Sequence, residues 1–234
     1  GMRWFPKTDE YSLGKGEINF NPSIRGKKNP NSRSVETSQD VTDEIVPLRF
    51  TKAELVGKIS EVYNLDGTVE PMKIHHKILM RIHEINQLDW KDYVPVEQRE
   101  VWMKVFKNIQ DARLIKWRRA VVPVDAVDPT KMRLIETNDG SQYGSSCAVY
   151  AGFLLRDGSY SCHLLFARST INDPSYTVPR NEQLGSVLGA QCLYILRHVF
   201  KNRIEDMISV GDSRCNICWE TNDKLRLKIW VFTR

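Results

Sequence analysis

The fold is decided by one stretch of the chain, Thr177-Val178-Pro179-Arg180-Asn181-Glu182-Gln183-Leu184. Pro179 fixes φ and has no N–H to donate, so it suits the first turn of a helix, with Thr177 as a possible cap. Beyond it, apolar residues recur at helical spacing to about residue 200: Leu184, Val187, Leu188, Leu193, Leu196 and Val199. The sequence therefore predicts a long buried helix, with Glu182 in its first turn, where the helix dipole favours a carboxylate.

Two aspartates follow strand-like apolar runs on either side of this helix. Asp139 ends one run and Asp212 follows another. The second half of the chain is predicted as strand, strand, strand, helix, strand, helix, strand, with a tight hairpin at Asp157-Gly158. The strand before Asp212 can run parallel to the strand before Asp139, because the long helix makes a right-handed crossover. Both aspartates would then lie side by side at the start of the helix, near Glu182.

The first half of the chain begins with a predicted hairpin and a polar region. Residues 2–20 contain three short apolar runs separated by proline and glycine. Residues 21–46 are rich in Asn and Ser, basic in their first part and acidic in their second. This composition predicts a long mobile insertion, and a solvated loop is favoured over a nucleic-acid-binding arm.

Three helices are predicted between residues 51 and 110. Thr51 and Glu54 form a capping box at the start of the first, and the others begin near Pro71 and after Pro95. Each has one apolar face, so we expect a small bundle. His75 and His76 point about 100° apart, so at most one faces inward, and surface or boundary positions are expected for both.

Composition limits the class of protein. The 234 residues carry a net charge of +5, which is compatible with a polyanionic partner. No apolar run approaches the roughly 20 residues of a membrane span. Five cysteines, an odd number, favour a reduced, intracellular protein, cytoplasmic or nuclear. Cys215 and Cys218 are half a zinc site at most, and core packing is the favoured interpretation.

Basic residues could contact a nucleic-acid backbone at two places. The character of the sequence changes near Trp117, Arg118 and Arg119, so we predict domains at residues 1–117 and 118–234. Packing is the alternative role for this tryptophan. Arg168 and Arg180 flank the predicted acidic site and could face phosphates, or could pair with nearby acids.

Several motifs resemble the polyproteins of BEL/Pao-type LTR retrotransposons. Asp139-Gly140-Ser141 resembles their Asp-Ala-Ser, and residues 165–169 followed by 177–184 resemble "AKS…TIPRLEL". Asp212-Ser213 with Trp219 is similar to "tDS…W", and residues 230–234 to "FVANR". Further motifs lie upstream: residues 1–9 resemble "GLxWxPxxD", Thr51-Lys52 with residues 64–67 resembles "TKR…FDPLG", and residues 88–92 resemble "LxWDD".

The resemblance implies an α+β or α/β protein: a small helical connection subdomain followed by a ribonuclease H-like, mixed five-stranded sheet flanked by helices. It implies metal-dependent hydrolysis of the RNA strand of RNA–DNA hybrids, and an upstream reverse-transcriptase domain as partner. Asp139 would bridge two Mg²⁺ (or Mn²⁺) ions, and Glu182 and Asp212 would complete the leaving-group site. The family's fourth acidic residue would lie beyond Arg234, so weak activity is expected.

Two alternatives remain open. Each carboxylate alone could be a turn former or a helix-start charge. The chain also has Asn181 and Gln183 where the family has Leu, and Ser145-Ser146 where it usually has Tyr-Gly. The altered flanks of Glu182 and the missing C-terminal acid favour a second function, a host-adopted or truncated ribonuclease H-like binding or scaffold module that is catalytically silent. The intact Asp139, Glu182 and Asp212 favour the nuclease.

Overall fold

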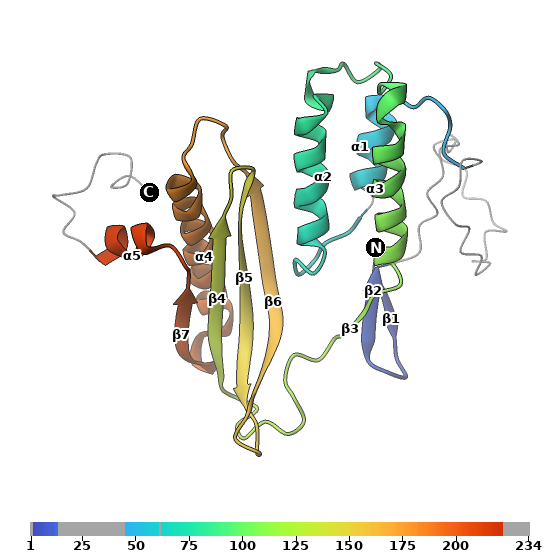
Figure 1. Cartoon of the computed structure of the whole chain (residues 1–234). Coiled ribbons are helices and arrows are strands. Elements are labelled where there is room, and N and C mark those ends of the chain that lie inside the picture. Colours follow the sequence, from blue (N-terminus) through green and yellow to red (C-terminus); the bar gives the residue numbers. More distant parts are fainter. Residues whose placement is uncertain (1, 14–44, 61, 222–234) are drawn as a thin grey trace. The chain divides into compact units, whose positions relative to one another are not determined.

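The computed structural model describes residues 2–13, 45–60 and 62–221, and the chain divides into two compact units (Figure 1). The first unit comprises residues 1–63 and 79–119, and the second comprises residues 64–78 and 120–234. The units change between residues 119 and 120, two residues beyond the predicted boundary between residues 117 and 118. Residues 64–78, however, group with the second unit. The third run of the expected hairpin, most of the insertion and the last predicted strand (227–232) lie outside the described residues.

A three-stranded antiparallel sheet begins the first unit. Its order is β1 (Met2–Phe5), β2 (Glu10–Leu13) and β3 (Lys116–Arg118). The first two strands form the predicted hairpin. The third comes from the end of the unit and pairs with β2, which places Trp117 opposite Tyr11. The sheet thus joins two segments that are far apart in the sequence.

Helices α1 (Lys52–Ser60) and α3 (Arg99–Ala112) form the core of the first unit. The capping box is confirmed, because the Thr51 backbone N–H donates to Glu54 Oε2 at 2.7 Å. The rings of Phe50 and Phe106 meet edge to face at 5.8 Å. Short 3₁₀ turns precede α3 at Ile85–Gln87 and Val96–Gln98.

The expected insertion ends earlier than predicted. Val46 is fully buried, and its carbonyl oxygen accepts a hydrogen bond from Arg99 Nη2 at 2.7 Å. Arg99 Nε donates to the next carbonyl, that of Pro47. Residues 45–48 are a short apolar run, Ile-Val-Pro-Leu, and a run this short gives no periodic signal.

Helix α2 (Glu70–Ile82) belongs to both units, since residues 70–78 group with the second and 79–82 with the first. His75 is exposed and His76 is fully buried. At most one of the pair faces inward, as predicted, but the expected surface or boundary position is wrong for His76. Among the described residues, neither nitrogen of its ring has a hydrogen-bond partner.

The second unit is built on a mixed four-stranded sheet of order β6-β5-β4-β7. Strands β4 (Met132–Gly140), β5 (Gly144–Leu154) and β6 (Tyr160–Ile171) are antiparallel. Strand β7 (Ile204–Val210) pairs with β4 in parallel, as predicted. The hairpin at residues 157–158 is also confirmed, with Gly158 at φ 83°.

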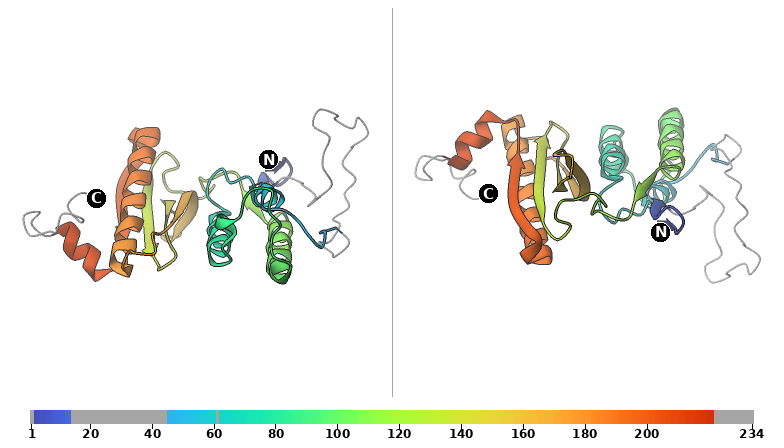
Figure 2. Two further views of the ribbon diagram at one scale, coloured as in Figure 1. Left: turned by 90° about the horizontal axis from the view of Figure 1, so that it is seen from above. Right: turned by 90° about the horizontal axis from the view of Figure 1, so that it is seen from below.

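Helix α4 (Val178–Phe200) lies along one face of this sheet (Figures 1 and 2). A 3₁₀ turn (Lys201–Arg203) leads from it to β7, and α5 (Arg214–Thr221) follows β7. The mixed α/β, ribonuclease H-like architecture expected from the sequence is confirmed. No helix of the described ranges is long and apolar enough to cross a membrane.

The core of the second unit lies between α4 and the sheet. Its buried members are Ala126, Met132, Leu134, Cys147, Val149, Ala151, Phe153 and Cys192. The fully buried residues of α4 are small or polar, and several predicted apolar residues are only half-buried. Val199 is 65% exposed, so the predicted stripe is wrong at its end. The helix approaches the sheet through its small side chains, which leaves larger ones at the margin of the contact.

Candidate carboxylate site

Asp139 and Asp212 lie at corresponding positions of two parallel neighbouring strands. The last register pair between β4 and β7 is Thr137 with Val210, and each aspartate lies two residues further along its chain. Alternation of side chains puts Asp139 on the sheet face opposite to the buried Glu136. Both aspartates are exposed. The register thus brings these two predicted residues to one end of the sheet.

The start of α4 lies directly against this end of β4. A Cβ on Gly140 would overlap the backbone of Asn181 and Glu182, and one on Gly185 would lie 2.8 Å from the Asp139 carbonyl oxygen. Only glycine permits this approach. Glu182 is the fifth residue of α4, so it lies just beyond the first turn and not within it as predicted.

A hydrogen bond ties Glu182 to the residue that follows Asp212. Ser213 Oγ donates to Glu182 Oε2 at 2.6 Å. Glu182 is half-buried, so this bond is partly shielded from water. The backbone positions of Asp139, Glu182 and Asp212 are therefore connected through one strand register, one glycine contact and one side-chain bond.

The three carboxylates do not form a ready cluster. Asp139 Oδ1 accepts a hydrogen bond from the backbone N–H of Gly140 at 2.7 Å, while Glu182 is held by Ser213. Over the described ranges, no group of three or more His, Cys, Asp or Glu side chains could hold a metal ion as placed. The residue types fit a hard cation such as Mg²⁺, which prefers carboxylate oxygen. The Ser213 hydroxyl engages Oε2 of Glu182, and the metal site stays a prediction.

A buried polar network holds the start of α4. Asn181 Nδ2 and Asn172 Nδ2 both donate to the Ser141 carbonyl oxygen, at 2.9 and 2.7 Å. The Ser145 hydroxyl lies 2.6 Å from the Asn181 carbonyl oxygen and 2.7 Å from Asn172 Oδ1. Ser145 and Asn181 are two of the positions at which the sequence differs from the motifs it resembles. Ser145 reaches the backbone carbonyl of Asn181, and the two side chains are linked through Asn172 and the Ser141 carbonyl oxygen.

Glu136 lies behind the site and was missed by sequence reasoning. It is 1% exposed, Asn138 Nδ2 donates to its Oε2 at 3.1 Å, and the Ser209 hydroxyl donates to the same oxygen. Burial raises the pKa of this carboxyl, although the Ser209 and Asn138 hydrogen bonds oppose the shift. Within the described part of the chain, Glu136 Oε1 has no hydrogen-bond partner. It lies against Gly189, where an added Cβ would overlap it. The available signal was a lone acid at an inward position of an apolar strand.

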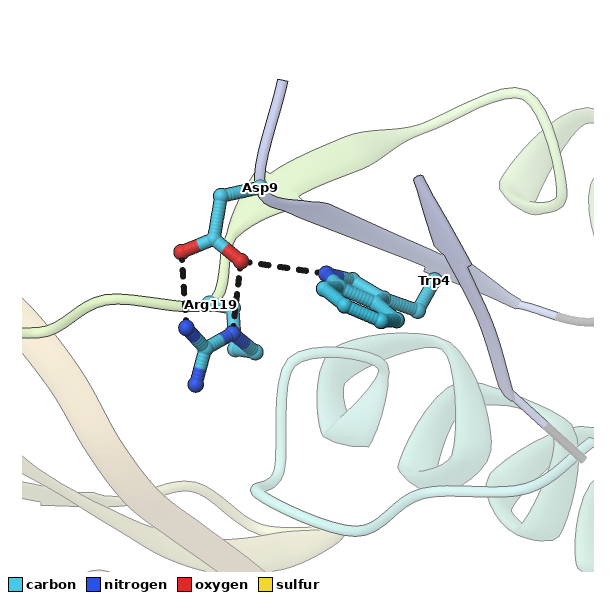
Figure 3. Close-up of polar contacts among 3 residues, drawn as sticks. All are labelled: Trp4, Asp9 and Arg119. Carbon is cyan, nitrogen blue, oxygen red and sulfur yellow. Dashed lines mark hydrogen bonds and ion pairs between the residues drawn. The ribbon is translucent and has the colours of Figure 1, made fainter. Parts of the chain in front are cut away.

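Arg119, a predicted nucleic-acid contact, is engaged within the first unit (Figure 3). Its Nε and Nη2 donate to the two carboxylate oxygens of Asp9 at 2.6 and 3.0 Å. Trp4 Nε1 donates to Asp9 Oδ1 at 3.0 Å. The Arg119 hydrogen bond, followed by that of Trp4, lowers the pKa of Asp9. The fork of this guanidinium is thus already occupied.

The other predicted contact residues are divided between the two units. Trp117 is half-buried in β3 beside the exposed Arg118. Arg168 is exposed on β6, and Arg180 is half-buried in the first turn of α4. Both cysteines of the 215–218 pair are exposed on α5, so the expected core packing is wrong for them.

The comparison with protein families agrees with this architecture. The family model described as "Pao retrotransposon-like RNaseH-like domain" matches residues 51–213. No curated protein matches the chain. The solved structure of a foamy viral protease-reverse transcriptase in complex with dsDNA is similar at 11% identity and a TM-score of 0.38, over 75% of this chain. The chain spans 36% of the length of that protein.

Proposed function

We propose that this chain, which belongs to the Pao retrotransposon-like RNaseH-like domain family, hydrolyses the RNA strand of RNA–DNA hybrids with the help of a divalent metal ion. The observation that carries the proposal is the parallel register of β4 and β7, which sets Asp139 and Asp212 at one sheet end. Glu182 joins them through the close approach of α4.

Asp139, Glu182 and Asp212 would hold the metal. Bound Mg²⁺ or Mn²⁺ would activate water and neutralise charge on the phosphate. Asp139 and Asp212 are exposed, so a nucleic-acid backbone can reach their carboxylates. The Ser213 hydroxyl positions Glu182 by donating a hydrogen bond to its Oε2.

The expected partners are an RNA–DNA hybrid and a reverse-transcriptase domain encoded upstream. Arg168 and Arg180 are the best candidates for phosphate contacts in the second unit, with Trp117 and Arg118 in the first. Arg119 is the weakest candidate, because phosphate would have to displace Asp9. Contacts to the backbone and the 2′-hydroxyls predict little base specificity.

The test is cleavage of a hybrid labelled on its RNA strand, with Mg²⁺, with Mn²⁺ and with chelator. Asp139→Asn and Asp212→Asn should each reduce the rate at least about a hundredfold, a loss of about 2.7 kcal/mol. Asp157→Asn is the matched control, because Asp157 lies in the β5–β6 turn, where its carboxylate accepts hydrogen bonds from Ser159. Unchanged cleavage by Asp139→Asn would refute the assignment.

A second candidate is a ribonuclease H-like binding module without turnover. The observation that favours it is the lack of a ready carboxylate cluster over the described ranges, with Asp139 and Glu182 held by separate hydrogen bonds. Hybrid binding that is unaffected by Asp139→Asn, with no cleavage by the unsubstituted chain in either metal, would support this candidate over the enzyme.

A further inference from the structure

Two cysteines face each other in the core of the second unit. Cys147 Sγ of β5 lies 3.6 Å from Cys192 Sγ of α4, and both residues are buried. The two positions are 45 residues apart in the sequence. A disulfide requires a sulfur separation near 2.05 Å, so the sulfurs must approach by about 1.5 Å.

A surface groove lies beside residues that neighbour this pair. It has a volume of about 480 Å³ and is lined by Arg168, Val187, Ala190, Gln191, Tyr194 and Ile195. Arg168 is the register partner of Cys147 across the β5–β6 ladder, and Gln191 precedes Cys192 on α4. Two residues that line the groove are therefore immediate neighbours of the two thiols.

We propose that Cys147 and Cys192 are a redox-active pair that peroxide converts to a disulfide joining α4 to the sheet. The Cys192 thiolate attacks one peroxide oxygen, the O–O bond breaks, and the departing hydroxide takes up a proton to become water. Cys147 then attacks the sulfenic sulfur, its proton leaves with the hydroxyl as a second water, and the S–S bond forms. Two thiols lose two electrons and the peroxide gains them.

The first step is assigned to Cys192, because this thiol directly follows the groove residue Gln191 on α4. The hydrogen bond from Cys147 lowers the pKa of Cys192, burial opposes this, and the charge of Arg168 lowers it further. The pKa of Cys147 is raised, first by its hydrogen bond to Cys192 and then by burial. Peroxide is the fitting oxidant, because both thiols are nearly inaccessible and it is small and uncharged. The product would fix the helix that carries Glu182 to the strand beside β4.

The experiment treats the purified, folded chain with hydrogen peroxide, blocks remaining thiols and digests it with trypsin without reduction. Residues 134–156 carry Cys147 and residues 181–197 carry Cys192, each as the single cysteine of its peptide. We expect these two peptides to be linked, with the loss of two hydrogen atoms. The oxidised chain should also unfold about 5 °C or more higher, reversibly with dithiothreitol.

Single substitutions test the order of the steps. In Cys147→Ser, which keeps a hydroxyl donor beside Cys192, a sulfenic acid should form at Cys192 and be trapped by dimedone, whereas Cys192→Ser should give no such adduct at Cys147. A second background with Cys162, Cys215 and Cys218 changed to serine should fall from two titratable thiols to none. Retention of both thiols in the folded wild-type chain, or sulfinic acid at Cys192 with Cys147 still reduced, would overturn the proposal.

Discussion

Ser213 donates a 2.6 Å hydrogen bond to Glu182. Ser213 directly precedes α5 and Glu182 lies near the start of α4, so the bond links the starts of two helices at the candidate site. The serine hydroxyl also accepts the backbone N–H of Asn216 at 3.3 Å, so it serves α5 and α4 together. Asp212 is the preceding residue. A substitution at Ser213 therefore affects two of the three proposed metal-binding residues, Glu182 and Asp212.

Removal of this hydroxyl should weaken the second unit moderately. Ser213→Ala deletes a hydrogen bond to a half-buried carboxylate, for which we expect a loss of about 1–2 kcal/mol in the free energy of unfolding. Ser213→Thr keeps the hydroxyl and is the matched control. Urea denaturation monitored by circular dichroism measures both variants. Equal stability of the alanine variant and the wild type would mean that the bond contributes nothing in solution.

Gly140→Ala should be far more harmful, because its Cβ would overlap the backbone of Asn181 and Glu182. Backbone cannot rotate aside, so α4 must move from β4, at a cost of about 3 kcal/mol or more. The control is Gly57→Ala in α1, where no atom lies within 4 Å of the new Cβ. That change should stabilise by about 0.5–1 kcal/mol. A well-folded, fully stable Gly140→Ala would contradict the close contact.

Glu136 predicts a stability that declines as pH rises. Burial raises the pKa of this carboxyl above its ordinary value of 4.5, so the folded state favours the protonated form. Its contribution is complete below the unfolded pKa and is lost as pH rises through the raised folded pKa. Glu136→Gln should therefore be more stable than the wild type at pH 7 and gain less at pH 4. Unfolding curves at both pH values measure this.

The control for Glu136 is the exposed Glu205→Gln on β7, which should show no such pH-dependent gain. The opposite result would be a Glu136→Gln variant that is less stable than the wild type, with a larger deficit at pH 7 than at pH 4. It would mean that the carboxylate is ionised in the folded protein. In that case the Ser209 and Asn138 donors outweigh its burial.

Local and topological signals could be read from the sequence, whereas tertiary burial of single polar residues could not. Thr51 and Glu54 are three residues apart and bond to each other, with no need of a distant residue, so the capping box was predictable. The parallel pairing of β4 and β7 followed from the right-handed crossover rule. Glu136 and His76 both carry polar groups into a core, where a pattern of apolar positions gives no warning. Val199 shows the opposite error, because this apolar residue is exposed although the helical spacing assigns it to the buried face.

His76 predicts acid sensitivity, and its sign is opposite to that of Glu136. Burial, and then the charge of His75, lowers the pKa of His76 from 6.5 to about 4. The folded state therefore binds fewer protons than the unfolded chain between these values, and stability is lost as pH falls from 6.5 toward 4. The full loss is about 3 kcal/mol, since each tenfold change in proton affinity is worth about 1.4 kcal/mol.

His76→Leu should remove this acid sensitivity. At pH 7 the variant should be at least as stable as the wild type, because both ring nitrogens of His76 lack hydrogen-bond partners among the described residues. His75→Asn is the matched control on the exposed side of α2 and should keep most of the loss. Urea unfolding at pH 7.5 and pH 4.5 compares the three chains. If His76→Leu loses as much stability between these pH values as the wild type, the buried imidazole is not the acid-sensitive group. If it unfolds at pH 7.5, the neutral ring makes contacts that leucine cannot replace.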